Sequence, residues 1–174
     1  MLVGLDIRNI LIIDHAEIIF TNGLNVLTGE TGAGKSILLD SLGFVLGWRG
    51  KTDIVRAGAD FGEVSVWFQV ETDHEVKEIL DEINITWEEE LLIRRVISAD
   101  GRKTAWINGR RAPRELLIRI STLLIEIHGQ HDDKGLLDQR SHIRLLDMFA
   151  ANSSQREAVK EAWRKLKKVN NEYQ

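Results

Sequence analysis

Apolar and polar residues alternate along several short stretches of the chain, and this period of two is typical of β-strands with one buried face. These stretches cover residues 2–13, 16–20, 62–71, 91–97 and 102–107. Asp14-His15 interrupts the first two, so residues 2–13 are expected to hold one or two strands. Asp100-Gly101, a strong tight-turn pair, joins the last two, and Asn108-Gly109 is a second such signal. The alternation therefore predicts antiparallel hairpins.

Two other segments are apolar without alternation and are predicted as buried strands. Leu24–Thr28 follows the turn residues Thr21-Asn22-Gly23 and precedes a glycine-rich loop. Leu123–Ile127 is the second apolar run, and it leads into His128-Gly129-Gln130-His131. Continuous short apolar runs of this kind favour strands that are covered on both faces.

Helical spacing of apolar residues appears in three places before the last part of the chain. Residues 37–46 repeat at intervals of three and four, and Gly47 is a suitable stop. Residues 75–83 carry a shorter helical pattern. Pro113 lies where the first turn of a further helix would begin. Strands and helices together predict the α/β class.

The last part of the chain has a different composition. From Ser154 onward it contains no glycine and no proline, and apolar residues step by 3, 4, 3 and 4 at Val159, Ala162, Leu166, Val169 and Tyr173. This spacing is the a/d seam of a coiled coil, and it stops without a C-cap. We expect a lobe at residues 1–150 and the start of a coiled-coil arm at 151–174. An amphipathic helix lying on the lobe is the open alternative.

Composition restricts the possible chemistry. The 174 residues are 43% hydrophobic and 29% charged, which is typical of one folded domain with a real core. No cysteine is present, so disulfides, zinc–thiolate sites and cysteine nucleophiles are excluded. The net charge is −4, so any contact with DNA must come from a local basic patch. No apolar run approaches the roughly 20 residues of a membrane helix, and we expect no membrane partner.

The glycine-rich loop matches the phosphate-binding pattern G-x-x-x-x-G-K-[ST]. Its residues are Gly29, Glu30, Thr31, Gly32, Ala33, Gly34, Lys35 and Ser36. Glycines let backbone N–H groups turn inward around phosphate oxygens, and the following helix adds the positive end of its dipole. Lys35 is expected to reach the β- and γ-phosphates, and the Ser36 hydroxyl to hold Mg²⁺. The sequence therefore predicts a nucleoside triphosphate site without fixing the reaction, because kinases, GTPases and ATPases share this loop.

Hydrolysis usually needs an acidic residue on the Mg²⁺ as well. No apolar run long enough to be the acidic strand ends in aspartate after the loop, since Leu145-Leu146-Asp147 is too short. Residues 10–14 form an apolar run that ends in Asp14, as the acidic strand requires, but they precede the loop. In one architecture, a long coiled coil separates the phosphate loop from the acidic strand, and the two ends of the chain meet to form one ATPase domain, the head. The sequence would then contain only the first half of such a head.

The chain resembles the SMC-like branch of the ABC ATPases. Three stretches carry the resemblance: Leu2–Asn9, Leu24–Asp40 with its phosphate loop, and Ile127–His131. It implies a P-loop ABC/SMC-type head lobe with a mixed N-terminal sheet and a parallel core beside the loop. It also implies binding of ATP with Mg²⁺ and a role in DNA double-strand break repair through ATP-driven head engagement. Gln130 matches the family's Q-loop glutamine, a ligand of Mg²⁺ that senses the γ-phosphate.

The resemblance also implies what the chain lacks. The family's Leu-Ser-Gly-Gly signature and acidic strand follow the coiled coil and are not found in this sequence. The chain alone is therefore expected to bind ATP weakly and to hydrolyse it poorly or not at all. The implied partners are DNA, the C-terminal half of the same head, and a second head in a homodimer. The implied location is the cytoplasm, at the nucleoid.

Two groups of cationic residues are candidates for DNA contacts. Arg49, Lys51 and Arg56 follow the phosphate-loop helix, and Arg110 and Arg111 follow the second tight turn. Contacts from such groups to phosphates would be independent of DNA sequence and sensitive to salt. A solvated loop without a ligand is the alternative interpretation of both groups.

Two other functions remain open from the residues alone. One is a self-contained P-loop enzyme such as a small-molecule kinase, which would turn over ATP without any further chain. The other is a non-catalytic interaction module that uses the helix at 154–174 and does not respond to nucleotide. Turnover that appears only when the missing half is supplied would separate the ATPase head from both.

Overall fold

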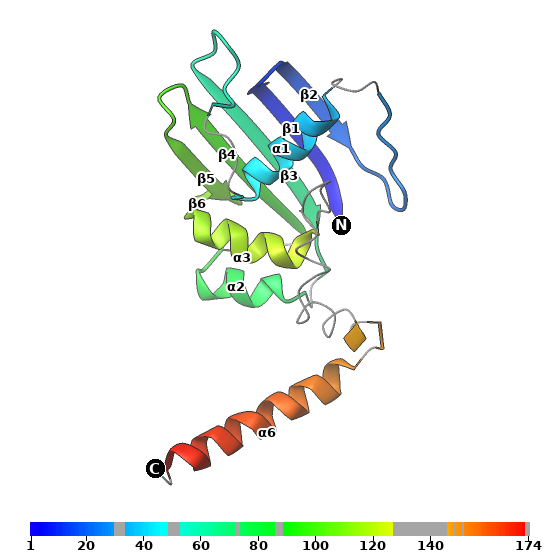
Figure 1. Cartoon of the computed structure of the whole chain (residues 1–174), viewed down its shortest axis with the longest axis vertical. Helices are drawn as coiled ribbons and strands as arrows, with labels where there is room; N and C mark the ends of the chain where they lie inside the picture. Colours follow the sequence, from blue (N-terminus) through cyan, green and yellow to red (C-terminus); the bar gives the residue numbers. More distant parts are fainter. Residues whose placement is uncertain are drawn as a thin grey trace. The chain divides into compact units, whose positions relative to one another are not determined.

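The computed structural model describes residues 1–29, 34–48, 53–71, 74–85, 89–126, 146–147, 149–150 and 152–172. The chain divides into two compact units, Met1–Glu126 and Ile127–Gln174. The first unit contains the sheet and the helices that cover it, and the second contains the C-terminal helix (Figure 1).

A six-stranded sheet forms the first unit, in the order β2-β1-β3-β4-β5-β6. The strands are β1 (Leu2–Ile10), β2 (Ile13–Ile19), β3 (Phe61–Gln69), β4 (Glu90–Ser98), β5 (Lys103–Ile107) and β6 (Arg110–Arg111). Every pair of neighbouring strands is antiparallel. The hairpins predicted at Asp100-Gly101 and Asn108-Gly109 are confirmed. The sheet is antiparallel throughout the described pairs, whereas the resemblance implied a mixed one.

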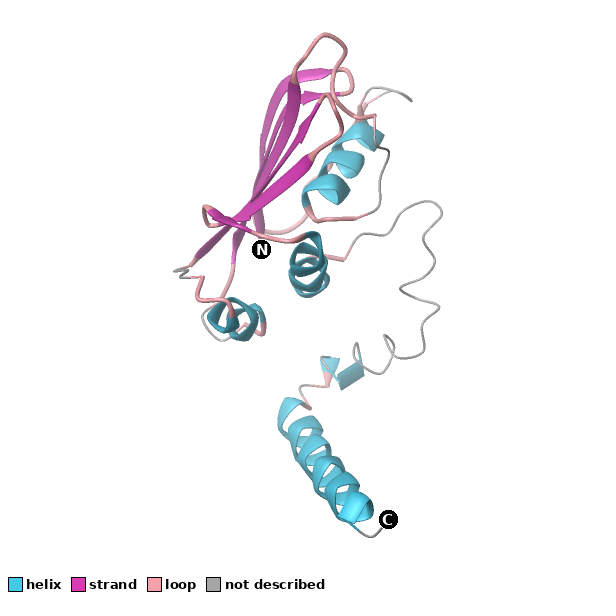
Figure 2. Cartoon of the chain, turned by 90° about the vertical axis from the view of Figure 1, so that its left-hand side faces the viewer, coloured by secondary structure: helices cyan, strands magenta, loops and turns pink. Residues whose placement is uncertain are grey.

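One face of the sheet forms the core. Val64 and Phe68 of β3 stand opposite Arg95 and Leu91 of β4, so these residues share a face. The apolar residues of that face are almost fully buried, from β1 across to β5. Within the first unit, Figure 2 shows the helices on one side of the sheet. The period-two alternation read from the sequence therefore identifies the buried face correctly.

The first hairpin turns earlier than the sequence suggested. The turn lies at Leu11-Ile12, and Asp14 and His15 belong to β2, so the predicted interruption at Asp14-His15 is wrong. Leu11 has a positive φ of 51°, and its N–H donates to the Ile54 carbonyl at 2.8 Å. Polar residues fit within β2 because this edge strand is largely solvated; His15 Nε2 lies 2.8 Å from an oxygen of Asp6.

The helices of the first unit are α1 (Lys35–Val45), α2 (Val76–Glu82) and α3 (Arg114–Leu124). Helix α1 packs on β1, β3 and β4, and α2 packs on α3 (Figures 1 and 2). Gly47 ends α1 as predicted, with a φ of 87°. A Cβ at this position would lie 3.0 Å from Cβ of Leu117, so Gly47 also permits the close approach of α3.

Helix α3 occupies part of the segment predicted as a strand at Leu123–Ile127. The helix continues through Leu124, residues 125–126 form no strand, and Ile127 lies outside the described residues. The buried residues Leu117 and Ile120 face the core at helical spacing. The helical period of the whole segment therefore decides its structure over the apolar run at its end.

Leu24–Thr28 is not a buried strand, and this prediction is wrong for the structure. The segment has no strand assignment and no sheet partner among the described residues, and Leu24 is 90% exposed. The Asn25 side chain instead donates to the carbonyl of Thr21 at 2.8 Å and organises a local turn. A core strand needs a neighbouring strand to pair its N–H and C=O groups, and the implied parallel core is absent from the described residues.

The described part of the second unit is mainly helix α6 (Ser153–Glu172). The helix predicted there is confirmed. Its apolar residues Val159, Trp163, Leu166 and Val169 are 51–68% exposed. The coiled-coil arm remains a prediction. No helix of the described residues is long and apolar enough to cross a membrane.

Candidate nucleotide site

Lys35 joins the two ends of the glycine-rich loop. It is the first residue of α1, and its Nζ donates a hydrogen bond of 2.5 Å to the carbonyl of Gly29. The predicted residues Glu30, Thr31, Gly32 and Ala33 lie outside the described residues. The structure therefore places the ammonium group of Lys35 beside Gly29, the first residue of the loop.

Gly34 sets the backbone for the start of α1. Its φ is 94°, a left-handed conformation, and no atom would meet a Cβ within 4 Å. Glycine is required here by the backbone and not by lack of space. The first helical hydrogen bond of α1 runs from the N–H of Leu38 to the carbonyl of Gly34 at 3.0 Å.

The first turn of α1 offers donors to an anion. The N–H groups of Lys35, Ser36 and Ile37 precede the first helical hydrogen bond, so they have no acceptor within the helix. No side chain caps this end, and its first turn holds no acidic residue. Lys35 and Ser36 are both exposed. Uncapped N–H groups, the helix dipole and an ammonium group together favour a phosphate.

The opposite end of α1 is fixed by Arg95, which the sequence interpretation missed. Arg95 Nη1 donates to the Phe44 carbonyl at 2.6 Å, and its guanidinium lies 4.8 Å above the Phe44 ring. Arg95 is 5% exposed, and no carboxylate of the described residues pairs with it. Burial lowers the pKa of Arg95, and the nearby Arg114 lowers it further. The one signal in the sequence was an arginine at an inward position of an alternating strand.

Of the metal ligands predicted, Ser36 alone can be located. Its hydroxyl is exposed at the start of α1, and a neutral oxygen of this kind suits Mg²⁺, a hard cation that keeps several of its waters. Gln130 lies outside the described residues. The described residues contain no group of three histidine or acidic side chains that could hold a metal by itself.

The structure does not gather the candidate DNA residues into one patch. Arg49 and Lys51 lie outside the described residues, and Arg56 forms an ion pair of 2.7 Å with Asp14. Arg110 donates to the carbonyls of Ile83 and Asn84.

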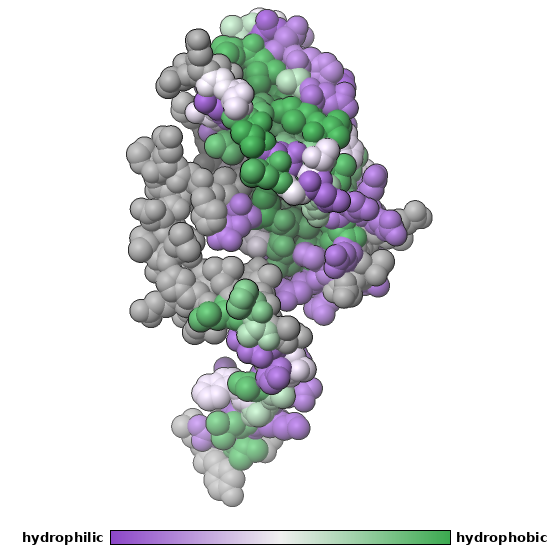
Figure 3. All heavy atoms as spheres, turned by 90° about the vertical axis from the view of Figure 1, so that its right-hand side faces the viewer, coloured by the Kyte–Doolittle hydropathy of each residue, from purple (hydrophilic) through white to green (hydrophobic). Residues whose placement is uncertain are grey.

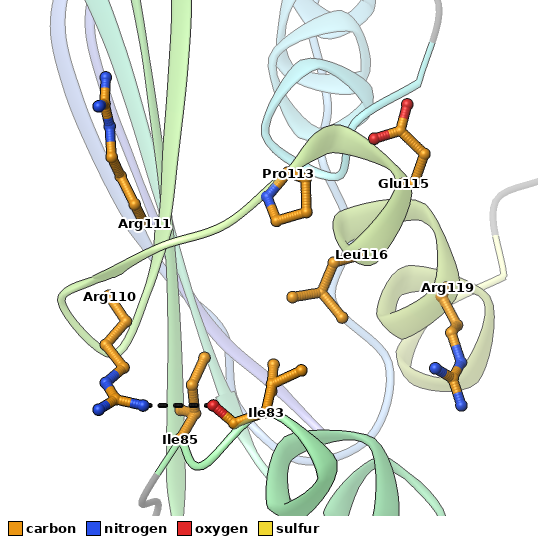
Figure 4. Close-up of a pocket in the computed structure, with 8 residues that line it drawn as sticks. All are labelled: Ile83, Ile85, Arg110, Arg111, Pro113, Glu115, Leu116 and Arg119. Carbon is orange, nitrogen blue, oxygen red and sulfur yellow. Dashed lines mark hydrogen bonds between the residues drawn. The ribbon is translucent and has the colours of Figure 1, made fainter.

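Arg110 and Arg111 are successive residues of β6, so their side chains leave opposite faces of the strand, as Figure 4 shows. The two guanidinium groups therefore do not form a single contact surface.

Comparisons with known proteins place the chain in a family. The sequence profile of the AAA domain family matches residues 5–174, nearly the whole chain. The chain belongs to the AAA domain family. Curated relatives of this AAA domain are DNA repair proteins named RecN. The protein from Xylella fastidiosa strain Temecula1 is 39% identical over 162 residues, which are 93% of this chain and 29% of the relative.

The RecN protein of Bacillus subtilis is 40% identical over 151 residues, covering 86% of this chain and 26% of the relative. The chain therefore spans less than a third of the length of these relatives. The resemblance to the SMC-like branch of the ABC ATPases, which rested on three short stretches of sequence, is confirmed.

Solved structures confirm the fold of the AAA domain. An Smc head bound to the C-terminal winged-helix domain of ScpA is 28% identical with a TM-score of 0.56, over 70% of this chain and 40% of that one. The Smc head of Pyrococcus yayanosii has a TM-score of 0.65 at 23% identity, over 92% of this chain and 34% of that one. The chain thus has the fold of an ABC/SMC-type head lobe, as predicted.

Proposed function

We propose that the chain is the nucleotide-binding lobe of a RecN-type ATPase head, and that it binds ATP with Mg²⁺ at the loop Gly29–Ser36. The observation that carries the proposal is the bond from Lys35 Nζ to the carbonyl of Gly29, at the uncapped start of α1. It supports an ammonium group at the same end of α1 as the N–H groups that have no acceptor within the helix. Relatives named DNA repair protein RecN support the type of head, and a solved RecF–ATP structure with a TM-score of 0.51 supports the choice of ligand.

Each residue of the site has a distinct role in this proposal. The ammonium of Lys35 moves from the carbonyl of Gly29 to the β- and γ-phosphate oxygens, exchanging a neutral acceptor for charged ones. The N–H groups of the loop and of the first turn of α1 hold the remaining phosphate oxygens. Ser36 and Gln130 bind Mg²⁺, which neutralises charge on the phosphates.

The rest of the head is proposed to cover the exposed apolar segment. Apolar surface gathers on the upper part of the face shown in Figure 3. Leu24, Val26 and Leu27 are 90%, 70% and 52% exposed, and Leu39 of α1 is 51% exposed. Exposed apolar residues in such a cluster mark a surface that another element covers. The C-terminal half of the same head would pair with residues 24–28 as a strand and supply the acidic residue.

In this proposal, ATP hydrolysis and the action on DNA require assembly of the head with a second head. A second head, in a homodimer, would place its signature segment against the bound ATP, and head engagement would then act on DNA at double-strand breaks. Arg49, Lys51, Arg56, Arg110 and Arg111 stay proposed as DNA contacts. The setting proposed for this activity is the cytoplasm, at the nucleoid. Charge reversal of Arg110 and Arg111 together should weaken DNA binding while folding stays intact, and unchanged DNA binding would remove these two residues from the proposal.

Hydrolysis of ATP by the chain, alone and mixed with the remaining part of a RecN-type head, tests the proposed function. We expect turnover only in the mixture, and its loss with Ser36→Ala. Turnover by the chain alone would favour a self-contained P-loop enzyme. A mixture that forms a complex but shows no response to nucleotide would favour an interaction module.

A further inference from the structure

A cavity of about 430 Å³ opens between the end of α2, β6 and the start of α3. It lies within the first unit, and its lining includes none of the described residues of the phosphate loop. The volume falls in the range of pockets that bury a small ligand or a large side chain with its neighbours.

The floor of this cavity is aliphatic. Ile83 and Ile85 come from the end of α2 and the residues after it, and Leu116 and Pro113 come from α3 and its N-cap. Figure 4 shows the side chain of Leu116 pointing toward the two isoleucines across the gap. None of the described residues that line the cavity is aromatic, so these residues offer no flat ring on which a nucleic-acid base could stack. The floor suits an apolar amino-acid side chain.

The rim is cationic. Among the described residues that line the cavity, Arg110, Arg111 and Arg119 are basic and Glu115 is acidic. Arg119 Nη1 forms an ion pair with Glu82 at 3.1 Å, and both side chains are more than half exposed. Such an exposed pair is weak and leaves Arg119 able to bind another carboxylate.

Arg110 is the most firmly held of the three. Its Nη1 donates to the carbonyls of Ile83 and Asn84, beside the floor (Figure 4). Carbonyl oxygens fix the guanidinium without cancelling its charge, and no carboxylate of the described residues pairs with it. The group is therefore pre-organised, with its remaining N–H donors available for an anionic partner.

We propose that this cavity is the docking site for an acidic peptide segment of a partner protein. An apolar side chain of the segment enters the floor formed by Ile83, Ile85 and Leu116, and flanking carboxylates bind Arg110 and Arg119. The match in charge selects an acidic partner, and the aliphatic floor selects a peptide over a nucleic acid.

Fluorescence anisotropy of a labelled synthetic peptide tests the proposal. The peptide contains glutamate and aspartate residues around one leucine and one phenylalanine, and the titration uses the whole chain without nucleotide. We expect saturable binding with a Kd of about 10 μM. Arg110→Glu and Arg119→Glu should each weaken it by about fivefold or more, because each replaces an attractive charge by a repulsive one. Leu116→Asp should abolish it.

Arg102→Glu is the matched control, since Arg102 is an exposed arginine paired with Asp100 and lies outside the cavity lining. This control should bind the peptide as the unchanged chain does, and circular dichroism should show the native spectrum for every variant compared. A peptide with asparagine and glutamine in place of its acidic residues should not bind. Equal losses for Arg102→Glu and the rim variants would overturn the proposal. The peptide site and the DNA contact proposed for Arg110 and Arg111 exclude one another. Displacement of the peptide by a single-stranded oligonucleotide with the same sensitivity to the rim variants would therefore overturn the peptide site.

Discussion

Arg95 of β4 donates a hydrogen bond of 2.6 Å to the carbonyl of Phe44, in the last turn of α1. The same guanidinium lies over the Phe44 ring. A cation at the C-terminus of a helix interacts favourably with the helix dipole, and here it also ties the sheet to α1. Because Lys35 begins the same helix, this contact fixes the element that follows the predicted phosphate loop.

Arg95→Met should destabilise the chain by about 2 kcal/mol or more, because it removes a charge-assisted hydrogen bond and a cation–π contact from a buried site. Urea unfolding followed by circular dichroism measures this change. Arg94→Met is the neighbouring control on the opposite face, where Arg94 is half exposed, pairs with Glu63 at 2.6 Å and lies 5.1 Å from the centre of the Trp106 ring. It should cost about 1 kcal/mol or less. Equal losses for the two variants would contradict the proposed anchor.

Gly47→Ala should destabilise the chain more than Gly101→Ala. Both glycines have a left-handed φ, 87° and 84°, so both variants carry the same backbone cost of about 1–2 kcal/mol. At Gly47 the new Cβ also meets Leu117 at 3.0 Å, whereas at Gly101 it meets nothing within 4 Å. The difference between the two midpoints in urea isolates the packing of α1 on α3. No difference would mean that α3 moves away freely.

Leu24→Glu should leave the stability of the chain within about 0.5 kcal/mol, because the side chain is 90% exposed. It should instead prevent the assembly of the chain with the remaining part of a RecN-type head, where the proposal buries this residue. Thermal unfolding and gel filtration of the mixture measure the two effects. Normal assembly of the variant would show that another surface meets the second half.

The Asp100 carboxylate makes the stability of the β4–β5 hairpin sensitive to acid. Its pKa falls from 3.8 to about 2, through a hydrogen bond from Ser98 first, and then through bonds from the Arg102 backbone and side chain. A folded-state pKa below the unfolded value stabilises the chain fully above the unfolded value, and this contribution disappears as the pH falls from about 4 to about 2. Asp100→Asn should therefore be less stable than the unchanged chain at pH 5. Between pH 4 and pH 2 its free energy of unfolding should fall by less than that of the unchanged chain. A carboxyl titration by NMR checks the pKa directly.

Local patterns predicted the elements that local interactions determine. Asn108 and Gly109 have φ values of 45° and 77°, which this dipeptide adopts readily, so the turn between β5 and β6 was visible in two residues. The helix after the loop and its stop at Gly47 were equally visible. The phosphate loop was predicted from spacing alone, because its chemistry requires glycines and a lysine at fixed positions, and it stays a prediction.

Features that depend on distant segments were not predicted. The first turn lies at Leu11 because its N–H pairs with Ile54, 43 residues further along the chain. Arg95 could not be assigned because its partner, Phe44, lies in a different element. Leu24–Thr28 has the composition of a core strand, but no described strand pairs with it. Composition gives the tendency of a segment, and the available neighbours decide its structure.

The affinity of the chain for ATP with Mg²⁺, measured by isothermal titration calorimetry, tests the central claim most directly. Lys35→Ala should weaken binding by at least about tenfold, because it removes charge-assisted hydrogen bonds to phosphate oxygens. Lys77→Ala, which removes an exposed lysine of α2, should leave the affinity unchanged. Equal affinity of the unchanged chain and the Lys35→Ala variant for ATP would contradict a phosphate site at the start of α1.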